Sequence, residues 1–238
     1  MRIFLAGAGG VIGRRLTPLL RAVGHTVVGT TRSPDKMAAL RVLGAEPVMV
    51  DAFDADGLLR AVMAAKPDAV IHQLTDLPFP PDSPRYAEGL ARNARLRVEG
   101  TRNLVAAAQA AGVKRMVAES IAFIYAPGPR ARVETDKLKP PEGDSATTVN
   151  AVIALEQSVL SMPEGIVLRY GYLYGQGTWS GDTPHPPAIH ADAAAHAAGL
   201  ALTRAKPGIY NVAEDDPSLS SAKAKGDFGF DAAFRFSP

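Results

Sequence analysis

Four glycines between an apolar run and an amphipathic pattern constrain this chain most strongly. Residues 2–6 (RIFLA) have the pattern of a buried strand, and residues 11–23 place apolar side chains at helical spacing. Gly7, Gly10 and Gly13 lie at the turn between them, with two residues separating each from the next. Backbone amides and the helix dipole at such a turn favour an anion, so the sequence predicts a phosphate-binding loop.

The same alternation of strand and helix continues along the chain. Further strands are predicted at residues 26–31, 47–50, 69–73, 114–118, 166–169 and 208–212. Helices are predicted at residues 35–43, 56–65, 148–161 and 191–203, with a long helical segment at 85–111. This order predicts an α/β fold: a Rossmann-type, doubly wound parallel sheet with helices on both faces. A chain of 238 residues is expected to form one such domain, 1–238.

Composition excludes several function classes. The chain has no cysteine, which excludes disulfides, thiolate metal sites and a cysteine nucleophile. A net charge of +2 gives no reason to expect a nucleic-acid or membrane partner, and no apolar run is long enough to span a bilayer. The five histidines are scattered, so no metal site is expected. The first strand starts at Arg2 and leaves no room for a signal peptide, so we expect a cytoplasmic protein with a small-molecule substrate.

The glycine spacing indicates a dinucleotide. Gly7 permits the tight turn, Gly10 lets a pyrophosphate approach, and Gly13 lets helix and strand pack closely. With Val11 and Ile12 at the start of the helix, these residues are expected to bind the cofactor. A close-packed turn without a ligand is the alternative.

The end of the second strand points to the cofactor type. It reads Thr31, Arg32, Ser33, where a NAD-specific site usually carries a carboxylate for the ribose hydroxyls. An arginine suits a 2′-phosphate, with Ser33 as a donor and Lys36 adding charge. NADP(H) is therefore favoured over NAD(H), the alternative being a solvated arginine at a strand end.

Beyond these motifs, the chain resembles the extended and atypical short-chain dehydrogenase/reductases, the NAD(P)-dependent epimerase/dehydratase family. The resemblance rests on VMVDAFD (48–54), VIHQLT (70–75), EGTRNLVAAAQAAGV (99–113), LRYGYLYGQG (168–177) and AIHADAAA (188–195). It implies cofactor contacts from residues that follow the third, fourth and sixth strands: Asp51, Ala52, Gln73, Leu74 and Tyr170.

The chain departs from that family at its reacting groups. Family enzymes use a Tyr-x-x-x-Lys pair, in which the lysine lowers the tyrosine pKa so that the phenol exchanges a proton with the substrate. Thr148 and Val152 occupy the two positions here, and Ile121 replaces a catalytic Ser or Thr. Arg97 replaces the usual asparagine of the long helix.

Tyr125 and Ser120 are the expected substitutes for the missing catalytic groups. They lie near the carboxyl end of the fifth strand, where open α/β sheets bind ligands, as Tyr170 and Tyr174 do near the sixth. The alternative is that these phenols pack and hydrogen-bond at the pocket rim.

The substrate region is reduced. Its elements are expected mainly within 120–190 and 213–238, but the connections at 177–185 and 217–220 are short for the family. Either the protein is a pared-down member or segments are missing from the sequence. The proline-rich stretch 126–146 is an ordered surface loop or a mobile lid.

Two further groups have a structural interpretation. His72 is predicted to be a core or pocket-wall residue, and His190 with Asp192 a pair that opens a helix. Arg92, Arg95, Arg97 and Arg102 suggest a solvated or subunit-facing side of the long helix, or a phosphate site. The resemblance implies a homodimer through 85–111.

Three functions remain open from the sequence. The first is an NADP(H)-dependent oxidoreductase or epimerase of a small carbonyl, hydroxyl or nucleotide-sugar substrate. The second is a non-catalytic NADP(H)-binding regulatory or redox-sensing protein, because the Tyr and Lys are missing. The third is an enzyme that relies on its substrate's own acid or base, for which positioning and hydride transfer suffice.

Overall fold

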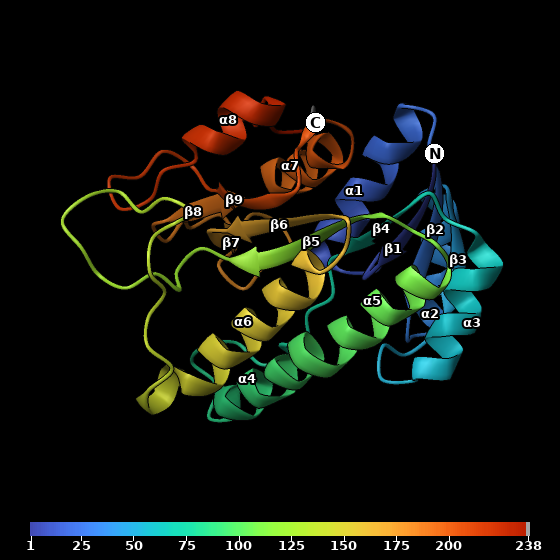
Figure 1. The fold of residues 1–238 in the computed structure, drawn as a ribbon, viewed down its shortest axis with the longest axis horizontal. Helices are drawn as coiled ribbons and strands as arrows, with labels where there is room; N and C mark the ends of the chain where they lie inside the picture. Colours follow the sequence, from blue (N-terminus) through green and yellow to red (C-terminus); the bar gives the residue numbers. More distant parts are fainter. Residues whose placement is uncertain (237–238) are drawn as a thin grey trace.

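A parallel sheet forms the centre of the molecule. The computed structural model describes residues 1–236, except for the side chain at position 144. Its seven-stranded sheet has the order β3-β2-β1-β4-β5-β6-β9 (Figure 1), and all neighbouring strands run parallel. The strands are β1 (Arg2–Ala6), β2 (Thr26–Thr31), β3 (Ala45–Met49), β4 (Ala69–His72), β5 (Arg115–Ile121), β6 (Glu164–Tyr170) and β9 (Gly208–Val212).

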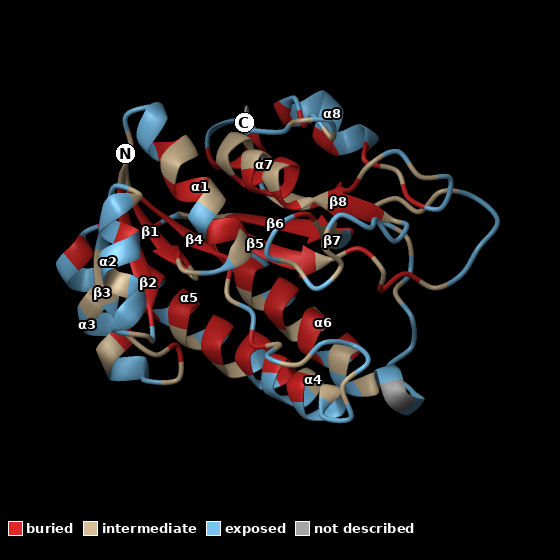
Figure 2. Ribbon diagram, turned by 180° about the vertical axis from the view of Figure 1, so that it is seen from behind, coloured by how far each residue is buried: buried red, intermediate tan, exposed pale blue. Residues whose placement is uncertain are grey.

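Helices cover both faces of this sheet. One face packs against α1 (Val11–Ala22), α2 (Asp35–Val42), α7 (Ala191–Arg204) and α8 (Ala222–Phe228). The other packs against α3 (Ala55–Ala65), α5 (Thr101–Ala110) and α6 (Ala146–Leu160) (Figure 1). The prediction of a Rossmann-type doubly wound sheet is confirmed, and the strands are almost continuously buried because both of their faces are covered (Figure 2).

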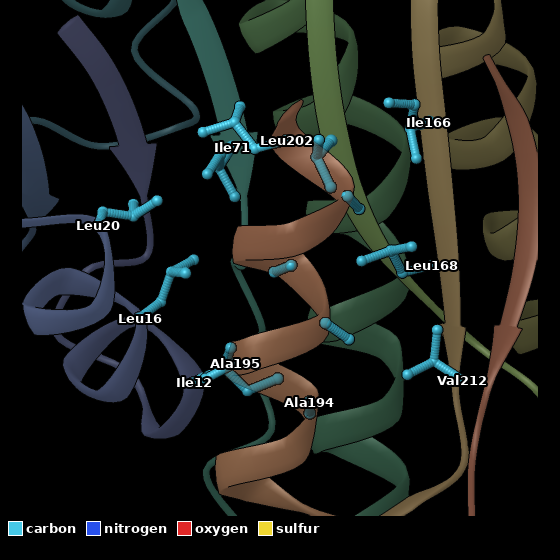
Figure 3. Close-up of a cluster of buried hydrophobic side chains, with 14 of the residues drawn as sticks. Ile12, Leu16, Leu20, Ile71, Ile166, Leu168, Ala194, Ala195, Leu202 and Val212 are labelled. Carbon is cyan, nitrogen blue, oxygen red and sulfur yellow. The ribbon is translucent and has the colours of Figure 1, made fainter. Parts of the chain in front are cut away.

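The core beneath the glycine loop combines large and small side chains. Ile12, Leu16 and Leu20 of α1 face an alanine-rich side of α7 that includes Ala194 and Ala195 (Figure 3). Small residues let the two helices approach closely, which anchors the helix that starts at the glycine loop.

The long helical segment is confirmed, with one irregular turn. It consists of α4 (Tyr86–Arg95), a π turn η1 (Leu96–Gly100) and α5, without a break between them. A π turn inserts an extra residue and changes the direction of the side chains in that turn. Arg97 in this turn is only 5% exposed, so the interpretation of the arginine run as one solvated helix side is wrong at this position.

Several elements differ from the prediction. β3 begins at Ala45 and includes Pro47, which an edge strand tolerates because one side of its ladder is free. β5 extends to Ile121. A short parallel ladder of β7 (Tyr172–Tyr174) and β8 (Ala188–His190), the 3₁₀ turn η2 (Gly143–Ser145) and helix α8 were not predicted. Among the described residues, no helix combines the length and the apolar character that crossing a bilayer requires.

Residues 126–146 form an ordered surface loop. Tyr125 bridges to Leu138 within the loop, and Arg132 bridges to Leu219 in the C-terminal segment. Two segments predicted to be substrate-side elements are therefore in direct contact beside the carboxyl end of β5.

Candidate functional site

The glycine turn has the geometry expected of a dinucleotide loop. Gly7 has φ of +89°, and a Cβ there would lie 2.3 Å from the carbonyl oxygen of Gln73. A Cβ on Gly13 would lie 2.2 Å from the carbonyl oxygen of Gly7. Any side chain at either position would push the first helix away from β1 and β4, so both glycines are required by close backbone approach.

A crevice runs across the carboxyl ends of β1, β2 and β4, with the glycine turn as its floor. Eight residues predicted to bind the cofactor line it: Gly7, Gly10, Thr31, Arg32, Asp51, Ala52, Gln73 and Leu74. Lys36, predicted to add charge, lines it as well, and so do Thr30, Thr75 and Leu96, which were not among the predicted contacts. The crevice lies where the strand order reverses between β1 and β4, which is the usual ligand position in open α/β sheets.

The remaining predicted cofactor residues lie beside or beneath this crevice. Val11 lines an adjoining hollow with Arg14 and Lys36. Ile12 is buried in the core, and the backbone amide of Ser33 donates to Thr31 Oγ1 at 3.0 Å. Tyr170 is 2% exposed and its hydroxyl donates to the carbonyl of Ala194, so it supports the crevice from below.

Cations dominate the adenosine side of the crevice. Arg32 is half exposed and lies 3.4 Å from Asp76. Arg92 lies 3.2 Å from the same carboxylate, so two arginines share one acid. Lys36 also faces the crevice. Arg32, Arg92 and Lys36 therefore outnumber the one carboxylate, Asp76, that the two arginines share.

Of the three residues predicted to stand at the family's catalytic positions, two are apolar, and Thr148, at the tyrosine position, carries a hydroxyl and is half-buried. Val152 is fully buried and packs in one cluster with Val149 and Ile124, and Ile121 packs against this cluster. Ile121 and Val152 are the residues that replace the family's Ser or Thr and its lysine. The structure thus brings these two residues together in one apolar cluster, whose partly buried members include Ile121 and which we call the apolar surface.

Tyr125 and Ser120 lie next to this surface in a buried polar network. Ser120 Oγ donates to Glu156 Oε1 at 2.7 Å, and Arg169 binds both oxygens of Glu156. Arg169 also donates to the Tyr125 hydroxyl at 2.7 Å, and this hydroxyl donates to Asn211 Oδ1 at 2.7 Å. Burial raises the pKa of Tyr125. Both hydroxyls are engaged within the protein, and their catalytic role stays a prediction.

Three buried polar atoms without a hydrogen-bond partner belong to residues at or near the carboxyl ends of β4 and β5 and in the π turn η1. They belong to Gln73, Arg97 and Glu119: one oxygen of Gln73, Nε of Arg97 and one oxygen of Glu119 make no hydrogen bond within the described residues. Burial raises the pKa of Glu119 to about 7, against an opposing effect of Arg97. Buried polar atoms normally have a protein or water partner, so these three side chains form a polar group inside an otherwise apolar sheet.

Sequence reasoning missed this cluster for two reasons. Glu119 lies in the middle of an otherwise apolar strand pattern, and that charge was the available signal. Arg97 was singled out only as a departure from the family, because the π turn that buries it is not visible in helical periodicity.

The histidines have the predicted structural roles. His72 is fully buried, its Nε2 lies 2.9 Å from Thr101 Oγ1, and burial lowers its pKa to about 4. His190 Nδ1 accepts from the amide of Asp192 at the start of α7. The described residues contain no cluster of three His, Cys, Asp or Glu side chains able to hold a metal ion.

A second cavity of about 420 Å³ lies beyond the apolar surface. Three segments line it: residues 122–132, Pro187 and residues 217–219. It contains Arg130 and Arg132 among proline and aromatic side chains. The structure therefore has a nucleotide crevice at β1, β2 and β4 and a separate cavity next to the end of β5.

Comparisons with known proteins agree with this geometry. A family model described as NAD(P)H-binding matches residues 7–155. The chain is 42% identical over 242 residues to a 3-diazoavenalumate denitrifying reductase from Streptomyces, covering 92% of this chain and 77% of that protein.

Solved structures with low identity share the fold. The enzyme WbmG from Bordetella bronchiseptica, solved with NAD and UDP, has a TM-score of 0.75 at 20% identity, over 99% of this chain and 90% of that one. UDP-glucose 4-epimerase from Thermotoga maritima, solved with UDP-glucose, has a TM-score of 0.77 at 17% identity, over 99% and 94%.

Proposed function

This chain belongs to the NAD(P)H-binding family within the short-chain dehydrogenase/reductases, and we propose that it is an NADPH-dependent reductase of a carboxylate-bearing aromatic diazonium compound. Its relatives make it an NAD(P)-dependent enzyme of the epimerase/dehydratase type. Two observations suggest this substrate class. One is the activity for which the Streptomyces relative is named, and the other is that the predicted proton donors Tyr125 and Ser120 are engaged within the protein.

The apolar packing of Ile121 with Val152 carries the proposal. Reduction of a carbonyl needs a proton at oxygen, and epimerisation at a carbinol needs a base at the hydroxyl. Neither group is available at the usual positions. A reaction that needs hydride alone fits this surface better, because the site then has only to hold the substrate against the nicotinamide.

Reductive loss of nitrogen is such a reaction. Hydride from NADPH adds to the ring carbon that carries the diazonium group. The carbon–nitrogen bond breaks, and its electron pair leaves with dinitrogen. One diazonium cation and one NADPH give one arene, one N₂ and one NADP⁺, so no proton is consumed. The cofactor supplies the hydride, and the chain's own residues bind, orient and exclude water.

The cofactor preference follows from the adenosine side of the crevice. Arg32 and Lys36 face the position of a 2′-phosphate, and Ser33 replaces the carboxylate that NAD-specific sites place there. This supports NADPH over NADH.

In the proposed reaction, Tyr125 and Ser120 hold the strand ends rather than transfer a proton. Their network joins β5, α6, β6 and β9 through Glu156, Arg169 and Asn211. A reaction in which no side chain donates a proton is therefore consistent with the apolar surface and with the hydrogen-bonded hydroxyls of Tyr125 and Ser120.

Label transfer tests the proposal. The protein is incubated with a diazotised aminohydroxybenzoate and NADPH that carries deuterium at C4 of the nicotinamide. We expect loss of the nicotinamide absorbance, evolution of N₂ and a hydroxybenzoate with one deuterium on the ring. Oxidation of NADPH by a panel of ketones, with the diazonium compound untouched, would contradict the proposal. UDP-glucose with NAD serves as the epimerase comparison.

A cofactor sensor is the second candidate. The observation that favours it is that the hydroxyls of Tyr125 and Ser120 are both engaged within the protein. Tight NADPH binding without turnover of any compound in the test would favour this candidate.

Assembly and location are part of the proposal. We expect a homodimer through residues 85–111, because Val98 in the π turn is an apolar side chain that is 42% exposed on the outer side of this segment. Sedimentation at several concentrations checks the dimer. We expect the enzyme to work in the cytoplasm, where its reduced cofactor is available.

A further inference from the structure

We propose that Arg132 binds the carboxylate of the substrate, in the cavity formed by residues 122–132, Pro187 and residues 217–219. This inference rests on the proposed function and names the part of the substrate that the second cavity takes. We call this cavity the anchor cavity.

Arg132 is a cation without a committed partner. The nearby carboxylate of Asp136 is already bound by Arg130, at 3.0 and 2.6 Å, and by the amide of Val133 at 2.9 Å. Arg132 lies 3.9 Å from Asp136, and its side chain is 16% exposed. One of its terminal nitrogens is buried and has no hydrogen-bond partner within the described residues. A buried donor costs free energy as long as it lacks an acceptor, so the hydrogen bonds of this guanidinium are not all satisfied within the described residues.

The backbone holds Arg132 in place. Its amide donates to the carbonyl of Ser218 at 2.8 Å, and its carbonyl accepts from the amide of Ser220 at 2.9 Å. Gly128 leaves room for the guanidinium, because a Cβ on Gly128 would lie 1.4 Å from its Nη2 nitrogen. The charge is therefore presented by a fixed loop, which lowers the cost of ordering it on binding.

The walls of the anchor cavity favour an anion with an apolar body. Phe123, Tyr125, Pro127, Pro187, Pro217 and Leu219 are among its lining residues. The ring of Phe123 stacks on Tyr172 with centroids 3.9 Å apart, so this wall is flat and supported from behind. A planar aromatic or unsaturated acid matches such walls better than a sugar does.

The charge balance favours a carboxylate over a diphosphate. Arg130 also faces the cavity, but Asp136 neutralises it. One uncompensated guanidinium pairs with a single negative charge, in the bidentate geometry that carboxylates accept. Two phosphates would require further cations, and among the described lining residues Arg130 and Arg132 are the cations present.

The anchor cavity adjoins the proposed reaction position. Its lining starts at Ala122, the residue after Ile121 in the apolar surface. The segment that follows β5 therefore contributes to both regions.

Binding without turnover tests the inference. The protein, saturated with NADP⁺ so that no reduction occurs, is titrated calorimetrically with 4-hydroxycinnamate, with its uncharged amide and with inorganic phosphate. We expect the acid to bind and Arg132→Gln to weaken it about 10- to 100-fold, the usual loss of a charged hydrogen-bond pair. The amide should bind more weakly to the wild type and respond little to the substitution.

Two further variants make the result specific. Gly128→Ala keeps the positive charge but displaces the guanidinium of Arg132. We expect it to weaken binding of the acid by a smaller factor than Arg132→Gln does. Arg85→Gln removes an exposed arginine that precedes α4 and pairs with Glu88, and should leave binding unchanged. The melting temperature of each variant shows that it is folded.

The inference is overturned if the acid fails to bind, if acid and amide bind equally, if Arg132→Gln has no effect, or if phosphate displaces the acid. Its failure is distinguishable from failure of the proposed function. Arg132-dependent acid binding without diazonium reduction contradicts the function alone, whereas diazonium reduction with an unchanged KM in Arg132→Gln contradicts the inference alone.

Discussion

The nucleotide crevice and the surface around Ile121 lie on the same sheet edge but are built differently. The crevice depends on backbone: glycines at Gly7 and Gly13 allow approach that a Cβ would block. The other region depends on side-chain identity: Val152 of α6 and Ile121 of β5 pack in one apolar cluster beside a regular parallel pairing of β5 with β6. A backbone-built site persists through substitution of its neighbours, whereas a side-chain-built site can lose or change its chemistry within the same fold.

The largest effect is expected at Gly7. Gly7→Ala adds a clash with the Gln73 carbonyl to an unfavourable φ of +89°. We expect loss of measurable NADPH binding and a cost to the free energy of unfolding of about 3 kcal/mol or more. Gly24→Ala is the matched control, since Gly24 has φ of +83° and open space around it. It should cost about 1 kcal/mol and leave binding intact, as urea unfolding and calorimetry would show. Equal losses in both variants would mean that close approach is unimportant.

Glu119, in the same strand as Ile121, should make the free energy of unfolding depend on pH. Its pKa is raised to about 7 by burial, above the value of an unfolded chain, so the folded state binds more protons between these values. The free energy of unfolding should therefore fall as pH rises through 7, by up to about 3 kcal/mol.

Glu119→Gln removes this dependence. Urea unfolding at several pH values between about 5 and 8 should show the variant gaining stability relative to the wild type as pH rises. His72, whose pKa is lowered to about 4, titrates in both proteins and cancels from the difference. A difference that is constant with pH would contradict the expectation.

Arg32 tests the charge of the crevice. Arg32→Asp should weaken NADPH about 100-fold and NADH only slightly, because the lost contact is to the 2′-phosphate. Arg41→Asp makes the same charge change on an exposed position of α2 and should shift both affinities equally and little. If Arg32→Asp weakened NADPH binding and NADH binding equally, the expectation would be contradicted.

The smallest effect is expected at Tyr125. Tyr125→Phe removes hydrogen bonds to Arg169 and Asn211, at a cost of about 1 kcal/mol in stability. We expect kcat for the diazonium compound to stay within about twofold, since no proton is needed. A loss of two orders of magnitude or more, with a changed pH profile, would instead make Tyr125 the acid and remove the contrast between the two regions.

Local sequence patterns predicted what depends on local geometry. The glycine spacing and the strand ends located the crevice, because consecutive residues there share one turn or one strand end. The anchor cavity depends on contact between Arg132 and Ser218, which are far apart in the chain, and no periodicity reports that contact. The burial of Arg97 depends on one inserted residue in a helix turn, which the amphipathic pattern averages away.

The short ladder of β7 and β8 has a consequence for engineering. It pairs Tyr172 with Ala188 and Tyr174 with His190, so it ties together both ends of the segment at 175–187. Lengthening a loop whose ends are already joined costs only about 0.6 kcal/mol for each doubling of its length. The segment is therefore an acceptor site into which a module such as a recognition domain or a reporter can be grafted while the sheet keeps its register.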